Sequence, residues 1–309
     1  MSVEPLRLGF IGFGEVGSRF AKDFSEAGVT GIVAYSRSSV DAPADDPVRA
    51  RAAEAGVALV ATPKALCERA SVVISVTPGA AALPALRKVK PYLTPAHIYV
   101  DASTSSAKDM ERAARMLAGR AAFVDAAVMD PVPLNGIRVL TVASGPQAEA
   151  FRALVTPYGM NVQVVGDKPG AASAMKLMRS VCMKGLAALL LESLEAAQRY
   201  GITDALVTDM ARFFDGRPFE EVVKRFVCGS AIHAGRRVHE TTESVALLRS
   251  LGASTRMTRS TRAVLQEIVA MGLRERFKAR EPEAIAPVLD AIIELKDEAG
   301  LRIRHQTAP

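Results

Sequence analysis

Cysteine is scarce in this chain of 309 residues, which contains only three cysteines, Cys67, Cys182 and Cys228. They lie far apart, are odd in number and include no CxxC pair, so the sequence predicts neither a disulfide framework nor a zinc ribbon. The histidines show no metal-ligand spacing either, and no metal is expected. Scarce, unpaired thiols fit a reducing compartment, and a cytoplasmic protein is therefore expected.

Long apolar runs and a strong charge excess are also missing. The most apolar stretch, residues 185–191, is much shorter than the roughly 20 residues of a membrane helix. No charged leader with an apolar core and a cleavage site opens the chain, so neither processing nor membrane association is expected. Lys and Arg number 39 against 33 Asp and Glu, a net charge of +6, which favours a small anionic ligand over nucleic acid.

The length and the hydrophobic content of 49% suit a folded protein of two domains. In residues 1–167, short apolar runs alternate with segments of helical periodicity such as 16–27 and 108–117, as in parallel βαβ units. This pattern predicts a Rossmann-type, doubly wound α/β sheet. Its strands are expected at residues 6–11, 32–35, 57–60, 72–76, 98–100, 123–128, 139–143 and 162–165.

Residues 168–309 are expected to form an all-α second domain. Residues 171–200 contain no proline and a single glycine, Gly185, which predicts one helix of about 30 residues and about 45 Å that joins the two domains. An apolar girdle on such a helix needs burial on more than one side, so a homodimer is expected. Further helices are predicted at residues 205–214, 219–226, 239–251, 258–271 and 284–299.

A Gly-x-Gly-x-x-Gly motif follows the first predicted strand and opens a helix: Gly12-Phe13-Gly14-Glu15-Val16-Gly17. In this context the first glycine permits a tight turn, the second lets a pyrophosphate approach the backbone, and the third allows close packing of helix and strand. The amides at the helix N-terminus then bind the phosphates. The motif predicts a dinucleotide site.

The end of the second predicted strand indicates which dinucleotide is bound. NAD sites place a carboxylate there, but this chain has Ser36, Arg37 and Ser38, which suit a 2′-phosphate. NADP is expected and NAD stays possible; the alternative is that Arg37 is only a solvated surface charge. Thr77 and Pro78 close the fourth strand and are expected beside the cofactor, because open α/β sheets bind ligands at the carboxyl ends of their strands.

Lys176, Ser180 and Lys184 follow at four-residue steps on the long predicted helix and share one of its faces. Such a stripe is ordinarily solvated. The other residues of this helix are mostly apolar, however, as in a helix buried between domains. A lysine partly withdrawn from water there has a lowered pKa and serves as an acid or base.

Four segments in this order resemble the β-hydroxyacid dehydrogenase family, which includes 3-hydroxyisobutyrate and 6-phosphogluconate dehydrogenases. They are the glycine loop, Asp101-Ala102-Ser103-Thr104, Asp125-Ala126-Ala127-Val128 and the helix start at residues 170–180. The resemblance spans nearly the whole chain and implies reversible oxidation of a hydroxyacid with a nicotinamide cofactor. It implies that Lys176 is the general acid/base, that Thr104 and Ser180 act beside it, and that Ser103 and Val128 border the substrate.

The substrate motif departs from the family pattern Asp-Ala-Pro-Val-Ser-Gly-Gly. Met129 replaces the serine that holds the substrate carboxylate and cannot donate that hydrogen bond, while Asp130 is expected to repel a carboxylate. By its spacing, Glu240 takes the place of a family residue near the nicotinamide. The pattern resembles a branch described as 6-phosphogluconate dehydrogenase-like with a C-terminal domain of unknown function.

His233, Arg236 and His239 cluster before the helix predicted at residues 239–251 and are expected to hold an anionic substrate; a solvated helix start or a subunit contact is the alternative. The sequence thus predicts an NADP-dependent oxidoreductase that interconverts a small hydroxyacid and its carbonyl form. Imine reduction on the same scaffold, favoured by the apolar Met129, and a non-catalytic NADPH-binding protein are the alternatives.

Overall fold

The computed structural model describes residues 5–36, 43, 46–103, 105–298 and 300. The chain divides into two compact units, Met1–Val181 and Cys182–Pro309. The division falls inside α8 (Ala171–Tyr200), whereas the predicted domain boundary at residues 167/168 lies just before this helix and stays a prediction.

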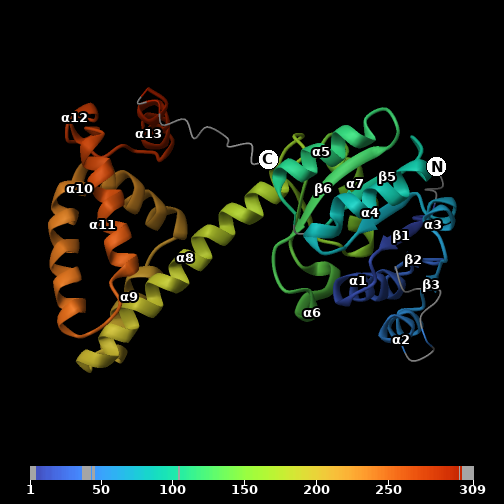
Figure 1. Ribbon diagram of the computed structural model, residues 1–309, viewed down its shortest axis with the longest axis horizontal. Helices are drawn as coiled ribbons and strands as arrows, with labels where there is room; N and C mark the ends of the chain where they lie inside the picture. Colours follow the sequence, from blue (N-terminus) through green and yellow to red (C-terminus); the bar gives the residue numbers. More distant parts are fainter. Residues whose placement is uncertain (1–4, 37–42, 44–45, 104, 299, 301–309) are drawn as a thin grey trace. The chain divides into compact units, whose positions relative to one another are not determined.

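The first unit is built on one eight-stranded sheet with the order β3-β2-β1-β4-β5-β6-β7-β8 (Figure 1). Each of the eight predicted strands is present, and the first five pair in parallel with their neighbours. The strands are β1 (Leu8–Ile11), β2 (Val33–Tyr35), β3 (Ala58–Leu59), β4 (Val72–Ser75), β5 (Ile98–Asp101), β6 (Ala122–Val128), β7 (Thr141–Ser144) and β8 (Val162–Val164).

One pairing differs from the parallel pattern, because β7 runs antiparallel to β6. The chain between them holds only α6 (Val132–Asn135) and the 3-10 turn η3 (Gly136–Arg138), and neither is long enough to cross the sheet as a parallel connection requires. Asp23 on α1 (Glu15–Glu26) accepts a hydrogen bond of 2.8 Å from the amide of Ile137 and holds this turn in place.

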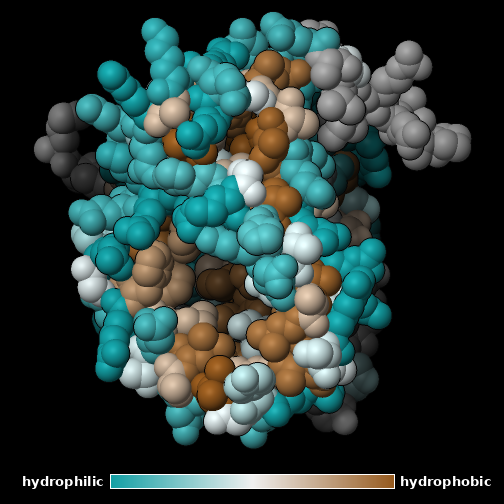
Figure 2. Space-filling model, turned by 90° about the vertical axis from the view of Figure 1, so that its left-hand side faces the viewer, coloured by the Kyte–Doolittle hydropathy of each residue, from teal (hydrophilic) through white to brown (hydrophobic). Residues whose placement is uncertain are grey.

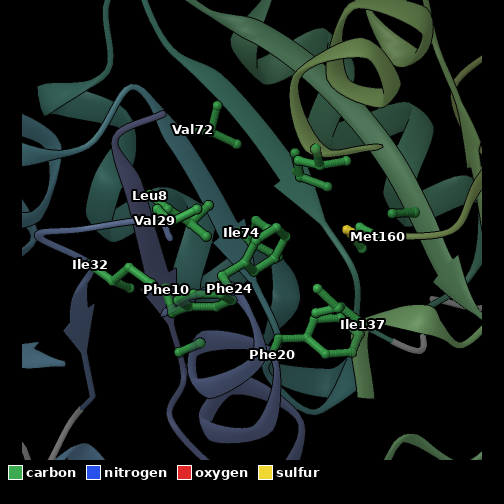
Figure 3. Packing of buried hydrophobic residues seen from close by; sticks show 14 of the residues in the cluster. Leu8, Phe10, Phe20, Phe24, Val29, Ile32, Val72, Ile74, Ile137 and Met160 are labelled. Atoms are coloured by element: carbon green, nitrogen blue, oxygen red, sulfur yellow. The ribbon is translucent and has the colours of Figure 1, made fainter. Parts of the chain in front are cut away.

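Helices cover both faces of the sheet, which confirms the doubly wound architecture. Apolar residues of α1 and its neighbours pack on one face around Phe10, Phe20 and Phe24 (Figure 3). Leu66, Leu86 and Met110 pack on the other. The first group comprises α1, α2 (Pro47–Glu54) and α7 (Ala148–Val155), and the second α3 (Pro63–Arg69), α4 (Ala82–Val89) and α5 (Ala107–Leu117).

The second unit is helical, and α8 has the bounds predicted for it. The helices that follow are α9 (Thr203–Asp215), α10 (Phe219–Ser250), α11 (Arg256–Ala270), α12 (Leu273–Arg276) and α13 (Ala286–Glu298). The expectation of two helices at residues 219–226 and 239–251 is wrong, because α10 is continuous. Its middle contains no proline, and Cys228, Ala231 and Ile232 are buried at helical spacing against α12 and α13. This packing stabilises the helix despite the glycines in its middle.

A buried carboxylate joins α8 to α11 within the second unit. Glu192 accepts hydrogen bonds from the amide and hydroxyl of Thr258, at 2.8 and 2.7 Å, from the Met257 amide at 3.0 Å and from the Ser254 hydroxyl at 2.8 Å. Burial raises the pKa of Glu192, but these hydrogen bonds, those of Thr258 first, together lower it to about 2. The carboxylate thus caps α11 from another helix.

Glu192→Gln is expected to lower the free energy of unfolding of the second unit by about 2–3 kcal/mol at pH 7, because hydrogen bonds to a charged acceptor are lost. A glutamate titrates near pH 4.3 when unfolded and near pH 2 here. Its contribution is therefore complete above about pH 4.3 and is lost as the pH falls through about 2. Urea unfolding at pH 7, 4 and 3 should show the two proteins converging in acid.

The matched control is Glu195→Gln on the same helix. Glu195 pairs with Arg199 on the exposed surface, and its loss is expected to cost no more than about 0.5 kcal/mol. Equal losses for Glu192→Gln and Glu195→Gln would contradict the capping role.

Candidate functional site

The glycine loop lies between β1 and α1, as predicted. Gly12 has φ +83°, a conformation that favours glycine, and its amide donates to the carbonyl of Tyr35 at 2.9 Å. A Cβ at Gly17 would lie 2.7 Å from the Gly12 carbonyl oxygen and 2.9 Å from Cγ2 of Val76. The first and third glycines of the motif are therefore required by the close packing of the loop itself.

Gly14 differs from the other two glycines. It precedes the first turn of α1 without a side-chain cap, and a Cβ built on it meets no other atom of the described residues within 4 Å. The described part of the chain thus leaves the space above this helix N-terminus open, with its amide groups available to an anion. These features fit the pyrophosphate of a dinucleotide.

Other predicted cofactor residues lie at the same end of the sheet, where the parallel strands have their carboxyl ends. The Val76 amide donates to the Ile11 carbonyl at 2.9 Å, so Thr77 and Pro78, which follow Val76, lie beside the glycine loop. The strand order reverses between β1 and β4, and ligands of open α/β sheets bind at such a switch point. Ser36 directly follows β2. Phe13 is buried in the core, whereas Glu15 is exposed. Arg37 and Ser38 lie outside the described residues.

Lys176 lies one turn into α8, on the part of this helix that belongs to the first unit. The first turn of α8 is bonded to β6, because the Ser173 hydroxyl and amide donate to Asp125 at 2.6 and 3.0 Å. Lys176 and Ser180 are both half-buried. Burial, and next the positive charge of Arg179, lower the pKa of Lys176. The helix start thus places an amine with a lowered pKa on the first unit.

β5 carries further polar residues at its carboxyl end. Ser103 is buried, and its amide donates to Asp101 at 3.0 Å. Asp101 is also buried, and its burial raises the pKa of the carboxyl group to about 6. Thr104, predicted to act beside Lys176, lies outside the described residues.

The segment at positions 129 and 130 is bonded to an arginine that the sequence analysis did not single out. Arg179 donates to the Met129 carbonyl at 2.5 Å and pairs with the Asp130 carboxylate at 3.0 Å. The charge of Asp130, expected to repel a carboxylate, is thereby offset. The Met129 side chain packs with Ala172 in a small buried cluster, and Val128 is half-buried at the end of β6.

The residues predicted on the second domain lie on α10. His233, Arg236 and His239 do not precede a helix, as was expected, but lie within one, because α10 is continuous. His233 lies 3.3 Å from Glu281, and Arg236 pairs with Glu240 at 2.5 Å, so both side chains already have partners within the chain. The substrate role of these residues and the cofactor role of Glu240 stay predictions.

The described residues form no cluster of three or more His, Cys, Asp or Glu side chains suited to a metal ion. Within the same part of the chain, no helix has both the length and the apolar character that a membrane crossing requires.

Two parts of the chain match known protein families. Residues 7–166, just over half of the chain, match the NAD binding domain of 6-phosphogluconate dehydrogenase. Residues 197–268 match a domain of unknown function, DUF1932. The resemblance seen in the sequence, including the C-terminal domain of unknown function, is confirmed.

Two solved structures resemble this chain over most of its length, and a curated relative matches about half of it. A conserved protein of unknown function, whose structure was described as similar to 3-hydroxyacid dehydrogenases, is 30% identical over 95% of this chain and 98% of its own, with a TM-score of 0.60. An imine reductase from Myxococcus stipitatus, solved with NAD+, has the same fold at 19% identity and a TM-score of 0.74, over 94% of this chain and 100% of its own. An NADH-dependent oxidoreductase from Aspergillus ustus is 28% identical over 48% of this chain and 52% of its own length.

Proposed function

Because the chain belongs to the family of the NAD binding domain of 6-phosphogluconate dehydrogenase, we propose that it is an NADPH-dependent oxidoreductase that interconverts a small hydroxyacid and its carbonyl form. The observation that carries this proposal is the half-buried Lys176, whose pKa is lowered, on a helix bonded to β6 of the nucleotide-binding sheet. An amine in that setting has the properties of a general acid or base.

The chain's own residues have separate tasks in this reaction. The amides of the glycine loop hold the pyrophosphate, and Arg37 with Ser36 and Ser38 holds the 2′-phosphate. A bound nicotinamide supplies or accepts the hydride. In the reducing direction Lys176 donates a proton to the developing alkoxide oxygen and stabilises its negative charge. Thr104 and Ser180 orient the substrate.

A turnover screen with both NADPH and NADH tests the proposal. The substrates are small hydroxyacids, the corresponding semialdehydes and keto acids, and a set of cyclic imines. Turnover of at least one hydroxyacid or carbonyl pair with NADPH is expected. Tight NADPH binding without any turnover would overturn the enzymatic proposal and favour a binding protein.

Imine reduction is a second candidate because of one observation in the site. Arg179, three residues after Lys176 on α8, is paired with Asp130, so its charge is not available to a substrate carboxylate. A neutral substrate therefore fits this site better than the family pattern implies. The fold of the Myxococcus stipitatus imine reductase is compatible with this reading. Turnover of imines alone in the screen would select it.

Arg37→Ala is expected to weaken NADPH binding about 10–30-fold and to change NADH binding less than about twofold, because only NADPH carries the phosphate that a guanidinium binds. Titration calorimetry with both cofactors measures the two ratios, and Arg49→Ala provides a second arginine as control. Equal losses for NADPH and NADH would exclude recognition of the 2′-phosphate by Arg37.

Because α8 exposes large apolar side chains, we propose that the protein is a homodimer. Met178, Val181 and Leu191 are 71%, 75% and 74% exposed in the single chain, and a helix with apolar residues on all sides is normally buried. Within the second unit, a cavity of about 680 Å³ is lined by apolar side chains such as Leu186, Phe213 and Leu247. Figure 2 shows hydrophobic side chains gathered around a hollow on this unit.

Sedimentation equilibrium should therefore give twice the mass of one chain. Val181→Glu is expected to shift the protein toward monomers, because it places a charge on the apolar surface of α8. Leu134→Glu is the matched control, since Leu134 is an equally exposed leucine on α6, and it should leave the dimer intact. A monomeric wild type would contradict the assembly.

A further inference from the structure

A row of buried polar side chains crosses the sheet of the first unit. Ser75 on β4, Asp101 on β5, Asp125 on β6 and Ser144 on β7 are register partners of one another in turn. All four are buried to at least 99%. Register partners on adjacent strands face the same side of a sheet, so the row lies on one face.

Asp125 is the member of this row that holds α8. The Ser173 hydroxyl and amide donate to it at 2.6 and 3.0 Å, and the Ser144 hydroxyl donates at 3.1 Å. Ser144 in turn accepts a hydrogen bond of 3.0 Å from the Ala172 amide. Two amides of the first turn of α8 are therefore bonded to β6 and β7 through fully buried side chains.

Within the first unit, the buried residues of α8 lie at the N-terminal end of the helix. Ala172 and Ser173 are buried, whereas Met175, Leu177 and Met178 are exposed. Lys176 follows Ser173 by three residues, so the rotation of the helix at Ser173 sets the direction of the amine. Arg179 provides a separate attachment through the carbonyl of Met129, which does not depend on Asp125.

A buried carboxylate is a costly way to cap a helix. Its desolvation is unfavourable unless several donors compensate for it, and a Ser or Asp at the helix start would satisfy the same amides at lower cost. What the carboxylate adds is a fixed connection between the first turn of α8 and the sheet that carries the nucleotide loop.

We propose that Asp125, together with Ser144 and Ser173, is a set of positioning residues that fixes the amine of Lys176 relative to the nucleotide-binding sheet. The inference rests on the proposed function in so far as Lys176 is the acid/base group. Asp125 itself touches neither substrate nor cofactor in this assignment; it acts through the first turn of α8.

Three variants separate positioning from mere stabilisation. Asp125→Ala removes all three hydrogen bonds and is expected to lower kcat about 10–100-fold, with the KM for NADPH changed less than twofold. Asp125→Asn should restore kcat to within about fivefold, because the amide oxygen accepts from the Ser173 amide and the Ser144 hydroxyl while the amide nitrogen donates to the Ser173 hydroxyl. Ser173→Ala, which removes one hydrogen bond, should fall between them and serves if Asp125→Ala does not fold.

The control is Asp23→Ala. Asp23 is another largely buried aspartate of the first unit, and it bonds Arg19 and the amide of Ile137 but no residue of α8. The Asp23→Ala substitution should reduce the stability of the protein without changing the pH dependence of kcat. A readout independent of turnover is the titration of the Lys176 amine, followed by NMR after reductive methylation with ¹³C-formaldehyde and assigned as the signal that Lys176→Arg lacks.

In the folded protein, burial is the main cause of the lowered pKa of Lys176, and Arg179, which is itself paired with Asp130, is the second. Loosening the first turn exposes the amine to water, so Asp125→Ala and Ser173→Ala should raise its pKa while Asp23→Ala should not. A wild-type titration and wild-type kcat in both Asp125→Ala and Ser173→Ala would overturn the inference. A shifted titration in a protein whose turnover survives Lys176→Ala would leave the positioning intact and refute the catalytic role instead.

Discussion

Lys176→Ala is expected to lower turnover by about 10²–10⁴-fold, the range by which a positioned general acid or base accelerates a reaction. The affinity for NADPH should stay within about twofold, because in the proposed site the glycine loop, and not α8, binds the cofactor phosphates. Steady-state kinetics together with NADPH titration separates the two effects.

The pH dependence gives a second signature of the same residue. Burial and the charge of Arg179 lower the pKa of Lys176 below the ordinary lysine value of 10.5. Only the protonated amine donates a proton, so reduction by the wild type should slow as the pH rises through this lowered pKa, and the alanine variant should lack that decline.

Lys184→Ala is the matched control, since Lys184 is an exposed lysine two turns further along α8. It should leave both turnover and its pH dependence unchanged. If Lys176→Ala and Lys184→Ala have the same small effect, Lys176 is a surface residue and the proposed chemistry fails.

Gly14→Ala is expected to raise the Kd for NADPH about 10–100-fold, or about 1.4–2.7 kcal/mol, while the free energy of unfolding changes by no more than about 1 kcal/mol. The added methyl group meets no other atom of residues 5–36, 46–103 or the rest of the described chain within 4 Å, so its cost is expected when a phosphate approaches the backbone. Calorimetric titration and urea unfolding of the same preparation measure both quantities.

Gly17→Ala should behave differently, because its methyl group would lie 2.7 Å from the Gly12 carbonyl oxygen. A loss of about 1–3 kcal/mol in the free energy of unfolding is expected from this overlap, along with weaker binding of NADPH. Gly185→Ala is the control for an open helical site and should stabilise by about 0.5–1 kcal/mol. Wild-type NADPH affinity in Gly14→Ala would place the phosphates elsewhere.

Local signals in the sequence were sufficient for most of the fold. The apolar runs form strands and the segments of helical periodicity form helices, because the apolar residues that create each pattern are the ones that pack in the core. α8 has its predicted bounds because no proline interrupts residues 171–200. The glycine loop was predictable because Gly12 and Gly17 each meet a steric requirement set by a few neighbouring residues, while Gly14 leaves open space at the start of a helix.

Features that depend on distant partners were not predictable in the same way. α10 runs through Gly229 and Gly235, where the sequence suggested a break, because its middle is buried against α12 and α13. The contacts of Arg179 with Asp130 and of Ser173 with Asp125 join residues 49 and 48 positions apart. The spacing of Arg179 three residues after Lys176 was a usable signal for the first of these, but its partner was visible only in the folded chain.

The outermost strands of the sheet are both very short. β3 has two residues and β8 has three, so each end exposes little unpaired backbone to which a foreign strand could bind. Long, flat edges invite lateral growth of one sheet onto another, and brief ones discourage it. Self-association of this protein by strand addition is therefore disfavoured, and copies that meet must recognise one another through side chains.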